Sequence, residues 1–175
     1  MIAGVCATPK PYAAAELYLH EETSFSKEEL VKHVILVALV ALGIAAAAQA
    51  APTKGAGVTV RSTQYGKVLF TSAGKALYVF EADKGTTSHC YGACAKAWPP
   101  LLTKGAPVAG KGIDHMLLGV AMRKNGAHQV TYKGHPLYRY SGDPIGKAKC
   151  QHVNANGGLW LVIAPNGRVN MSKAK

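Results

Sequence analysis

An internal repeat, in which the pattern of residues 66–90 recurs at residues 126–150, constrains the fold of this 175-residue chain more than any other feature. When these two segments are aligned without a gap, seven of their 25 positions carry the same residue. The identical pairs are Gly66/Gly126, Thr71/Thr131, Gly74/Gly134, Leu77/Leu137, Tyr78/Tyr138, Asp83/Asp143 and Cys90/Cys150. A unit of this size does not bury its apolar face alone, so we expect two copies that pack against each other.

Each copy has the residue pattern of short β-strands separated by turns. The segments rich in β-branched and aromatic residues are 58–62, 67–71 and 76–80 in the first copy, and 117–123, 129–132, 136–140, 159–164 and 168–171 in the second. Turns are indicated by Gly or Asn-Gly at 73–75, 124–126, 133–135 and 165–167. One helical turn is expected at 91–97. The predicted fold is mainly β, with small antiparallel sheets from two pseudo-equivalent β units at about residues 57–105 and 115–171.

Both copies contain the motif Tyr-x-aromatic-x-x-Asp. The motif residues are Tyr78, Phe80 and Asp83 in the first copy and Tyr138, Tyr140 and Asp143 in the second. Alternation along a strand places the two aromatic side chains of a motif on one face. The Asp falls where the strand ends, and its carboxylate can accept backbone N–H groups of the following turn. We expect an aromatic core with structural Asp residues; an aromatic platform that faces a ligand is the alternative.

These motifs resemble those of a bacterial family of secreted proteins and lipoproteins that is defined by a repeated Yx(FWY)xxD motif. The resemblance covers residues 57–165 and includes Cys90-Tyr-Gly-Ala-Cys94, Trp98-Pro-Pro-Leu-Leu and Gly158-Leu-Trp-Leu-Val. It implies an extracytoplasmic protein with no assigned reaction. Many members of the family carry a lipid anchor, but this chain has no Cys at the expected cleavage point, which favours a soluble form. Trp98 and Trp160 are expected to close each unit.

The N-terminal part of the chain, up to Ala50, has the pattern of an export signal rather than of a folded domain. Residues 34–48 are uninterrupted apolar residues, preceded by Lys32 and His33 and followed by small residues that end at Ala50. This pattern predicts a signal helix at residues 31–50, cleaved near Ala50. An uncleaved membrane anchor is the alternative, although about 20 residues are needed to span a bilayer. Residues 1–30 are acidic and are interpreted as an over-extended N-terminus. Residues 51–175 are then a periplasmic or secreted domain with no membrane span.

Cysteine and histidine residues suggest one disulfide and one alternative metal site. In an oxidising compartment we expect Cys90 and Cys94 to form a disulfide, with a bridge from Cys150 to the other copy as the alternative. His89 adjoins Cys90, and His152 follows Cys150 by two residues. Thiolate and imidazole ligands suit copper better than calcium or magnesium. We expect no cofactor, and copper bound by these five residues remains the alternative.

The charge of the exported part indicates the kind of partner. Residues 51–175 contain 17 Lys and Arg against four Asp and Glu, a net charge of +13. Such a domain is attracted to polyanions. Its basic residues form no run, and export separates it from nucleic acid, so an anionic envelope component or a small ligand is the expected partner. Nothing in the sequence indicates an oligomeric state.

The sequence contains no catalytic signature, so no enzymatic activity is expected. Neither a G-x-S-x-G motif nor a phosphate-binding Gly-rich loop is present, and the four carboxylates of residues 51–175 leave little room for an acid/base pair. We therefore predict a non-enzymatic binding or structural module. The alternative is a periplasmic redox or copper-handling protein that uses its Cys and His residues.

Overall fold

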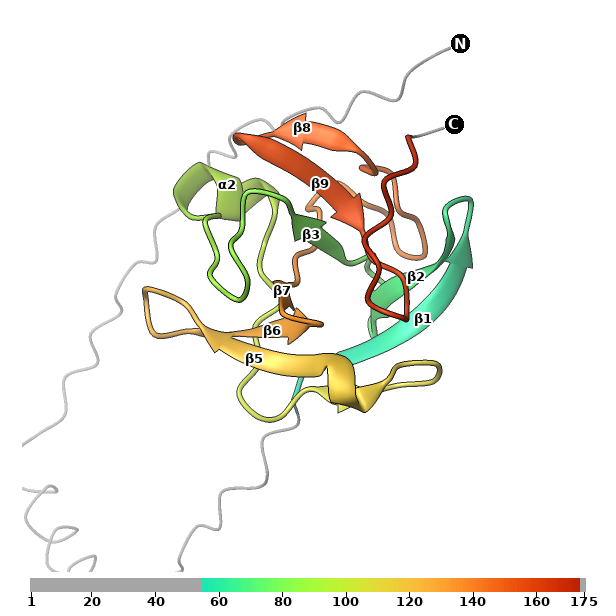
Figure 1. The fold of residues 1–175 in the computed structure, drawn as a ribbon, viewed down its shortest axis with the longest axis horizontal. Coiled ribbons are helices and arrows are strands. Elements are labelled where there is room, and N and C mark those ends of the chain that lie inside the picture. Colours follow the sequence, from blue (N-terminus) through green and yellow to red (C-terminus); the bar gives the residue numbers. More distant parts are fainter. Residues whose placement is uncertain (1–54, 174–175) are drawn as a thin grey trace, which may run out of the picture. The chain divides into compact units, whose positions relative to one another are not determined.

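The computed structural model describes residues 55–173, and this part of the chain contains three small sheets (Figure 1). The first sheet has the order β2 (Gly66–Thr71), β1 (Gly57–Thr63), β4 (Val108–Ala109). The second has the order β3 (Tyr78–Phe80), β9 (Gly158–Val162), β8 (Val153–Ala155). The third has the order β5 (Leu118–Met122), β6 (His128–Tyr132), β7 (His135–Pro136). The predicted signal helix, its cleavage site and residues 1–30 lie outside the described residues.

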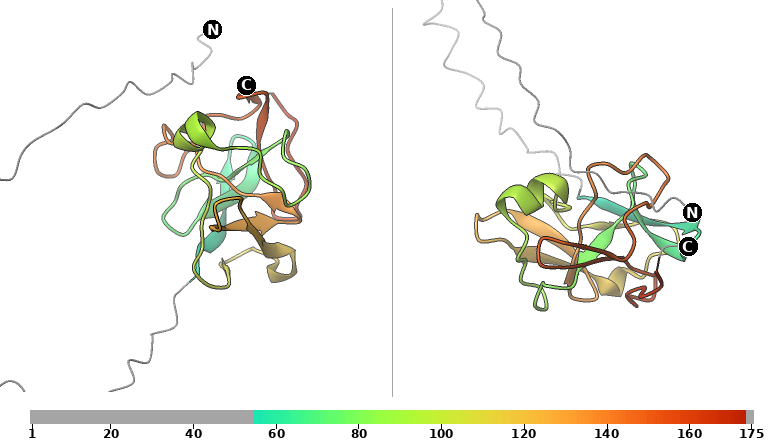
Figure 2. Two further views of the ribbon diagram at one scale, coloured as in Figure 1. Left: turned by 90° about the vertical axis from the view of Figure 1, so that its left-hand side faces the viewer. Right: turned by 90° about the horizontal axis from the view of Figure 1, so that it is seen from above.

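The helical content of residues 55–173 is small. Helix α2 spans Gly92–Ala97, where one helical turn was expected, and a single 3-10 turn, η1, spans His115–Leu117. Figure 2 shows α2 at the edge of the described unit in both views. No helix in this part of the chain is long and apolar enough to cross a membrane. The prediction of a mainly β fold is confirmed.

The sequence located the five longest strands of the described residues. Strands β1, β2, β5, β6 and β9 fall within two residues of predicted segments. The expected strand at 168–171 is reduced to one bridge, Ile163↔Val169, and flanking backbone hydrogen bonds. The hairpin β8–β9 was missed, although Asn156 and Gly157 at its turn have the positive φ values that Asn-Gly turns supply.

The expectation of purely antiparallel sheets is wrong at one place. Strands β1 and β4 pair in parallel over two positions, Gly57↔Val108 and Val58↔Ala109. Parallel neighbours need a long connection, and here the chain between β1 and β4 runs through β2, β3 and α2. Strand β4 therefore joins the edge of the first sheet through a long-range pairing, which the turn residues in the sequence do not predict.

The two repeats exchange their central strands. Strand β3 of the first repeat pairs with β9 of the second, in the register Tyr78↔Val162 to Phe80↔Trp160. The counterpart in the second repeat, residues 137–139, pairs with residues 99–101 of the first: Leu101 N–H donates to the Leu137 carbonyl, and Arg139 N–H donates to the Pro99 carbonyl. Pairing across repeats explains why the predicted strand 136–140 is not a hairpin arm of β6 beyond Pro136.

A pseudo-twofold relation between the repeats is visible at their centre. The backbones of Tyr78 and Tyr138 exchange two hydrogen bonds, each with an N···O distance of 2.9 Å. These residues occupy the same position in the two copies of the repeat. A reciprocal pair of this kind arises when two equivalent antiparallel strands meet at a twofold axis.

Alternation along the exchanged strands divides the interior into two apolar clusters. One cluster contains Tyr78 and Phe80 together with both Trp residues, and the other contains Leu77 and Val79. Strand β3 is buried on both faces as a result. A strand with two buried faces has no polar alternation, and both clusters around β3 include residues of the second repeat.

We predict that neither repeat folds alone. Fragments 51–112 and 113–175 each contain a central strand whose pairing partner, β9 or residues 99–101, lies in the other fragment. Each should give the narrow amide dispersion of an unfolded chain in NMR spectra. An equimolar mixture should regain the dispersion of the intact protein. A single fragment with a native-like spectrum would show that strand exchange is not required for folding.

Candidate functional site: a tyrosine, tryptophan and aspartate core

Two crossed hydrogen bonds connect the motifs of the two repeats. The Tyr78 hydroxyl donates to Asp143 Oδ2 at 2.6 Å, and the Tyr138 hydroxyl donates to Asp83 Oδ2 at 2.7 Å. Each bond therefore joins the Tyr of one motif to the Asp of the other. Hydrogen bonds to an ionised acceptor are shorter and stronger than neutral ones, which agrees with these distances.

The second oxygen of each carboxylate closes the loop that follows its own strand. Asp83 Oδ1 accepts the backbone N–H of His89 at 2.7 Å, and Asp143 Oδ1 accepts that of Lys149 at 3.1 Å. His89 and Lys149 are again equivalent positions of the two copies. The sequence predicted a bond to the following turn, and the structure has it six residues beyond each Asp. Each carboxylate thus ties its own loop to the tyrosine of the other repeat.

Burial shifts the pKa of all four groups in the crossed pairs in one direction. It raises the pKa of Tyr78 and of Tyr138 far above the usual range of a phenol, and the neighbouring carboxylates add to the shift. Burial also raises the pKa of Asp83 and Asp143, although hydrogen bonds and nearby basic groups oppose that rise. The phenols consequently remain protonated and act as donors.

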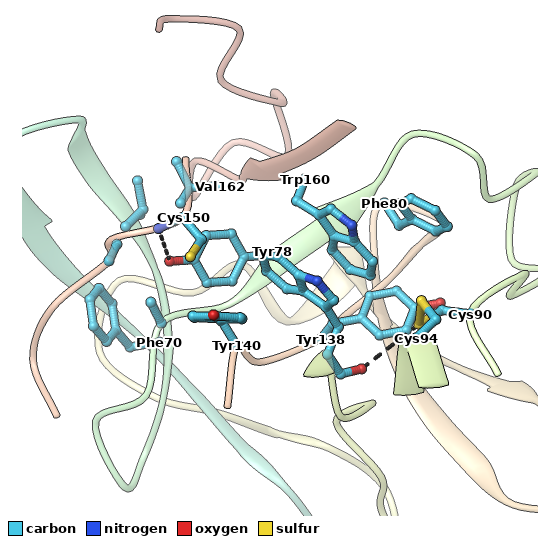
Figure 3. Close-up of a cluster of buried hydrophobic side chains, with 14 residues drawn as sticks. Phe70, Tyr78, Phe80, Cys90, Cys94, Tyr138, Tyr140, Cys150, Trp160 and Val162 are labelled. Atoms are coloured by element: carbon cyan, nitrogen blue, oxygen red, sulfur yellow. Dashed lines mark hydrogen bonds between the residues drawn. A yellow bond between two sulfur atoms is a disulfide. The ribbon is translucent and has the colours of Figure 1, made fainter. Parts of the chain in front are cut away.

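An aromatic stack fills the space between the crossed pairs (Figure 3). The Trp98 and Trp160 rings are parallel within 4°, with centroids 4.0 Å apart. Phe80 stacks on the outer side of Trp160 at 4.2 Å, and Tyr140 lies against Trp98 at 4.7 Å. The two Trp residues, which we expected to close separate units, contact each other at the centre of the molecule.

The tyrosines of the motif contact this stack edge-on. Tyr78 meets Trp98 with centroids 5.3 Å apart, and Tyr138 meets Trp160 at 5.2 Å, both nearly perpendicular. The most exposed aromatic ring of the two motifs, Tyr140, is only 8% exposed. The alternative of an aromatic platform that faces a ligand is therefore wrong, because these rings are part of the core.

The cysteines belong to the same buried cluster. Cys90 and Cys94 form a disulfide at α2. A bridge from Cys150 to either of them is thereby excluded. Cys150 is fully buried, its N–H donates to the Tyr78 hydroxyl at 3.3 Å, and no described cysteine is a free thiol.

A buried arginine network was not found by the sequence analysis. Arg123 is 6% exposed; its guanidinium donates to Ser88 Oγ at 2.9 Å, to the Cys90 carbonyl at 2.6 Å and to Gln129 Oε1. It also lies over the Tyr91 ring, 4.4 Å from the centroid. Ser88 Oγ is in turn 2.8 Å from the Tyr138 hydroxyl. The network therefore connects β5 to one crossed pair, and no sequence signal distinguishes this Arg from a surface one.

The residues considered for copper have different surroundings. His89 is exposed, His152 is half-buried in a turn with a φ of 57°, and Cys90 is bonded to Cys94. Among residues 55–173, no group of three or more His, Cys, Asp or Glu side chains could hold a metal ion.

The geometry defines a class: a mainly β protein built from two strand-exchanged repeats, with a Tyr-x-aromatic-x-x-Asp motif at the centre of each. Residues 59–102 and 119–164, which together span more than half of the chain, match the Lipoprotein_15 family, described as a secreted repeat of unknown function. The chain belongs to this secreted family, as its motifs predicted. No curated protein matches it, and no solved structure does.

We predict that the crossed pairs are energetically coupled and that pairs within one motif are not. Tyr78→Phe leaves an acceptor oxygen of buried Asp143 without its donor, which costs about 1–3 kcal/mol of unfolding free energy. In a double-mutant cycle by urea denaturation, Tyr78→Phe with Asp143→Asn should show a coupling of about 1 kcal/mol or more. The matched cycle with Asp83→Asn should be close to additive. Equal coupling in the two cycles would contradict the crossed arrangement.

We also predict a loss of stability at alkaline pH that depends on the two buried phenols. Their pKa is raised in the folded state, so the stability they contribute is complete below the unfolded tyrosine pKa of about 10 and is lost as the pH rises above it. The free energy of unfolding should fall from about pH 10 to about pH 12, and phenolate absorbance from these residues should appear only with unfolding. In Tyr78→Phe/Tyr138→Phe the fall should be shallower; the same steepness as in the wild type would refute this assignment.

Proposed function

We propose that this protein is a non-enzymatic module that binds an anionic component of the cell envelope through its basic surface. The observation that carries the proposal is the separation of charge between surface and interior. Of the four acidic residues between 55 and 173, Asp83 and Asp143 are used in the core, and only Glu81 and Asp114 are exposed. Twelve basic residues are exposed: Arg61, Lys67, Lys84, Lys96, Lys104, Lys111, Lys124, Lys133, Lys147, Lys149, Arg168 and Lys173.

The segment 144–149, which we call the basic loop, has the most suitable chemistry for such contact. Lys147 and Lys149 are exposed, and Ile145 beside them is 70% exposed. The loop rests on the first repeat: Gly146 N–H donates to the Gly74 carbonyl at 2.8 Å. The Arg61 guanidinium lies next to the Gly74 and Gly146 turns. If Gly146 carried a methyl group, that group would be 3.7 Å from Arg61 Nη1.

An apolar side chain flanked by ammonium groups fits a surface of anionic lipid headgroups. Each basic residue close to such a surface contributes about 1 kcal/mol of attraction, and salt screens it over about 10 Å. A single exposed isoleucine adds apolar contact without requiring a membrane-spanning segment. The basic loop therefore suits reversible binding that weakens as ionic strength rises.

The polar groups of the core support a module without enzymatic activity. The Tyr, Asp, Ser and Arg side chains there bond to one another, and all of them are buried except Asp83, which is half-buried. A surface hollow of about 740 Å³ beside Leu102 and His128 offers room for a small ligand.

Copper handling has less support than binding, because Cys90 and Cys94 are joined in a disulfide and His89 faces solvent.

We predict salt-dependent binding to anionic vesicles that requires the basic loop. The protein should sediment with phosphatidylglycerol-containing vesicles at low salt, much less at high salt, and not with phosphatidylcholine vesicles. Lys147→Glu/Lys149→Glu should lower the affinity by about tenfold or more, since each lysine contributes about 1 kcal/mol. Lys96→Glu/Lys124→Glu is the control, and it has the same net charge as the loop variant. Its substitutions lie in α2 and in the β5–β6 turn, on the other side of Figure 1 from the β1–β2 hairpin.

Equal losses in the two variants would show that net charge alone matters and would remove the role of the basic loop. If the wild-type protein does not bind anionic vesicles at low salt, an anionic lipid surface is excluded as the partner.

A further inference from the structure

We propose that the core carries one-electron oxidising equivalents along a path of four aromatic rings, each end of which is a phenol bonded to a carboxylate. The rings are, in order, Tyr78, Trp98, Trp160 and Tyr138. The carboxylates are Asp143 at the first end and Asp83 at the second. This inference concerns the interior and is independent of the proposed surface binding.

The rings of this path are in contact from end to end. Successive centroids lie 5.3, 4.0 and 5.2 Å apart. Electron tunnelling weakens steeply with distance, so adjacent rings at van der Waals contact exchange an electron far faster than rings separated by solvent or aliphatic side chains. Tryptophan and tyrosine are also among the side chains that lose one electron most readily. Phe80 and Tyr140 cover the two outer faces of the Trp pair.

Oxidation of a phenol requires a place for its proton. The radical cation of tyrosine is a strong acid, and in an apolar interior its formation is prohibitive unless the proton leaves as the electron does. Tyr78 has Asp143 Oδ2 at 2.6 Å, and Tyr138 has Asp83 Oδ2 at 2.7 Å. Burial keeps both phenols protonated and raises the pKa of both carboxyl groups, so that each carboxylate is a better proton acceptor than in water.

The step balances with a one-electron oxidant at the surface. The oxidant removes one electron from a Trp ring of the path, and Tyr78 then supplies an electron to that ring. Its O–H bond breaks, and the proton passes to Asp143 Oδ2. The products are a neutral tyrosyl radical, a neutral carboxylic acid and the reduced oxidant. The same step at the other end uses Tyr138 and Asp83.

The oxidant does not need to enter the core. Tyr140, which packs on Trp98, is 8% exposed, and Trp98 itself is 2% exposed. Tyr140 is the most exposed ring that packs on the Trp pair, at 8% against 4% for Phe80. An oxidised metal complex at the surface can draw an electron from Trp98 through Tyr140.

Stability alone is a weak reason for the two carboxylates. Burying an ionised group costs free energy, and apolar side chains of similar size often give equal or greater stability. The arrangement nevertheless occurs twice, with phenol, carboxylate and indole in the same relation at both ends of the stack. Each carboxylate holds the loop that follows it, and it also gives the phenol of the other repeat the proton acceptor that an oxidation path requires.

The test is laser-flash oxidation of the protein with photogenerated ruthenium(III) tris-bipyridine. Transient absorption and EPR should show a tryptophan radical that converts into a tyrosyl radical, with a slower conversion in deuterium oxide. In Asp83→Asn/Asp143→Asn the conversion should slow by about 100-fold, the usual effect of losing a positioned base. Tyr78→Phe/Tyr138→Phe should remove most of the tyrosyl signal. The matched control Tyr65→Phe/Tyr91→Phe changes two half-buried tyrosines outside the path and should retain the signal.

Two results would overturn the proposal. One is an equal tyrosyl yield in the path variant and its control, which would place the radical on a tyrosine outside the path. The other is a conversion rate that is unaffected by the Asp substitutions and by deuterium oxide. If the double Asp variant does not fold, Asp143→Asn alone and the isotope effect on the wild-type protein decide the question, because neither depends on that variant.

Discussion

The crossed bonds between Tyr78 and Asp143 and between Tyr138 and Asp83 are the interaction on which the rest of the structure depends. They bring the two motifs face to face, and that contact sets the exchanged strand pairing and the Trp98–Trp160 stack between them. The same carboxylates hold the loops that precede Cys90 and Cys150. Breaking one crossed bond therefore affects a strand pair, a loop and an aromatic contact together.

Much of this arrangement was predictable because its signals are local. The repeat, the turns, the buried motif aromatics and the Cys90–Cys94 spacing each depend on residues close together in the chain. Strand exchange was not predictable, since two equivalent units show the same periodicity whether each strand pairs within its own repeat or across. The Trp stack follows from that exchange. Arg123 was missed for a different reason: a lone Arg at a strand end has the same sequence context whether it is buried or exposed.

The charged residues divide between two regions with different physics. In the core, carboxylates are few and paired with phenols at low dielectric, where each hydrogen bond is strong and each unpaired group is costly. At the surface, lysines outnumber acids and interact through solvent, where salt weakens them. The two regions meet at one place, because the Lys149 N–H of the basic loop donates to Asp143 Oδ1 at 3.1 Å. Elsewhere, binding at the surface and electron movement through the aromatic path depend on different residues.

Strand exchange also bears on how such a chain can arise. A single ancestral repeat would expose its central strand, and two copies meeting at a twofold axis would satisfy that strand as the two halves of this chain do. The present chain has the connectivity of a symmetric dimer whose two halves are joined covalently. Once they are joined, each half is free to change by itself. Phe80 of the first copy corresponds to Tyr140 of the second, and His89 corresponds to Lys149.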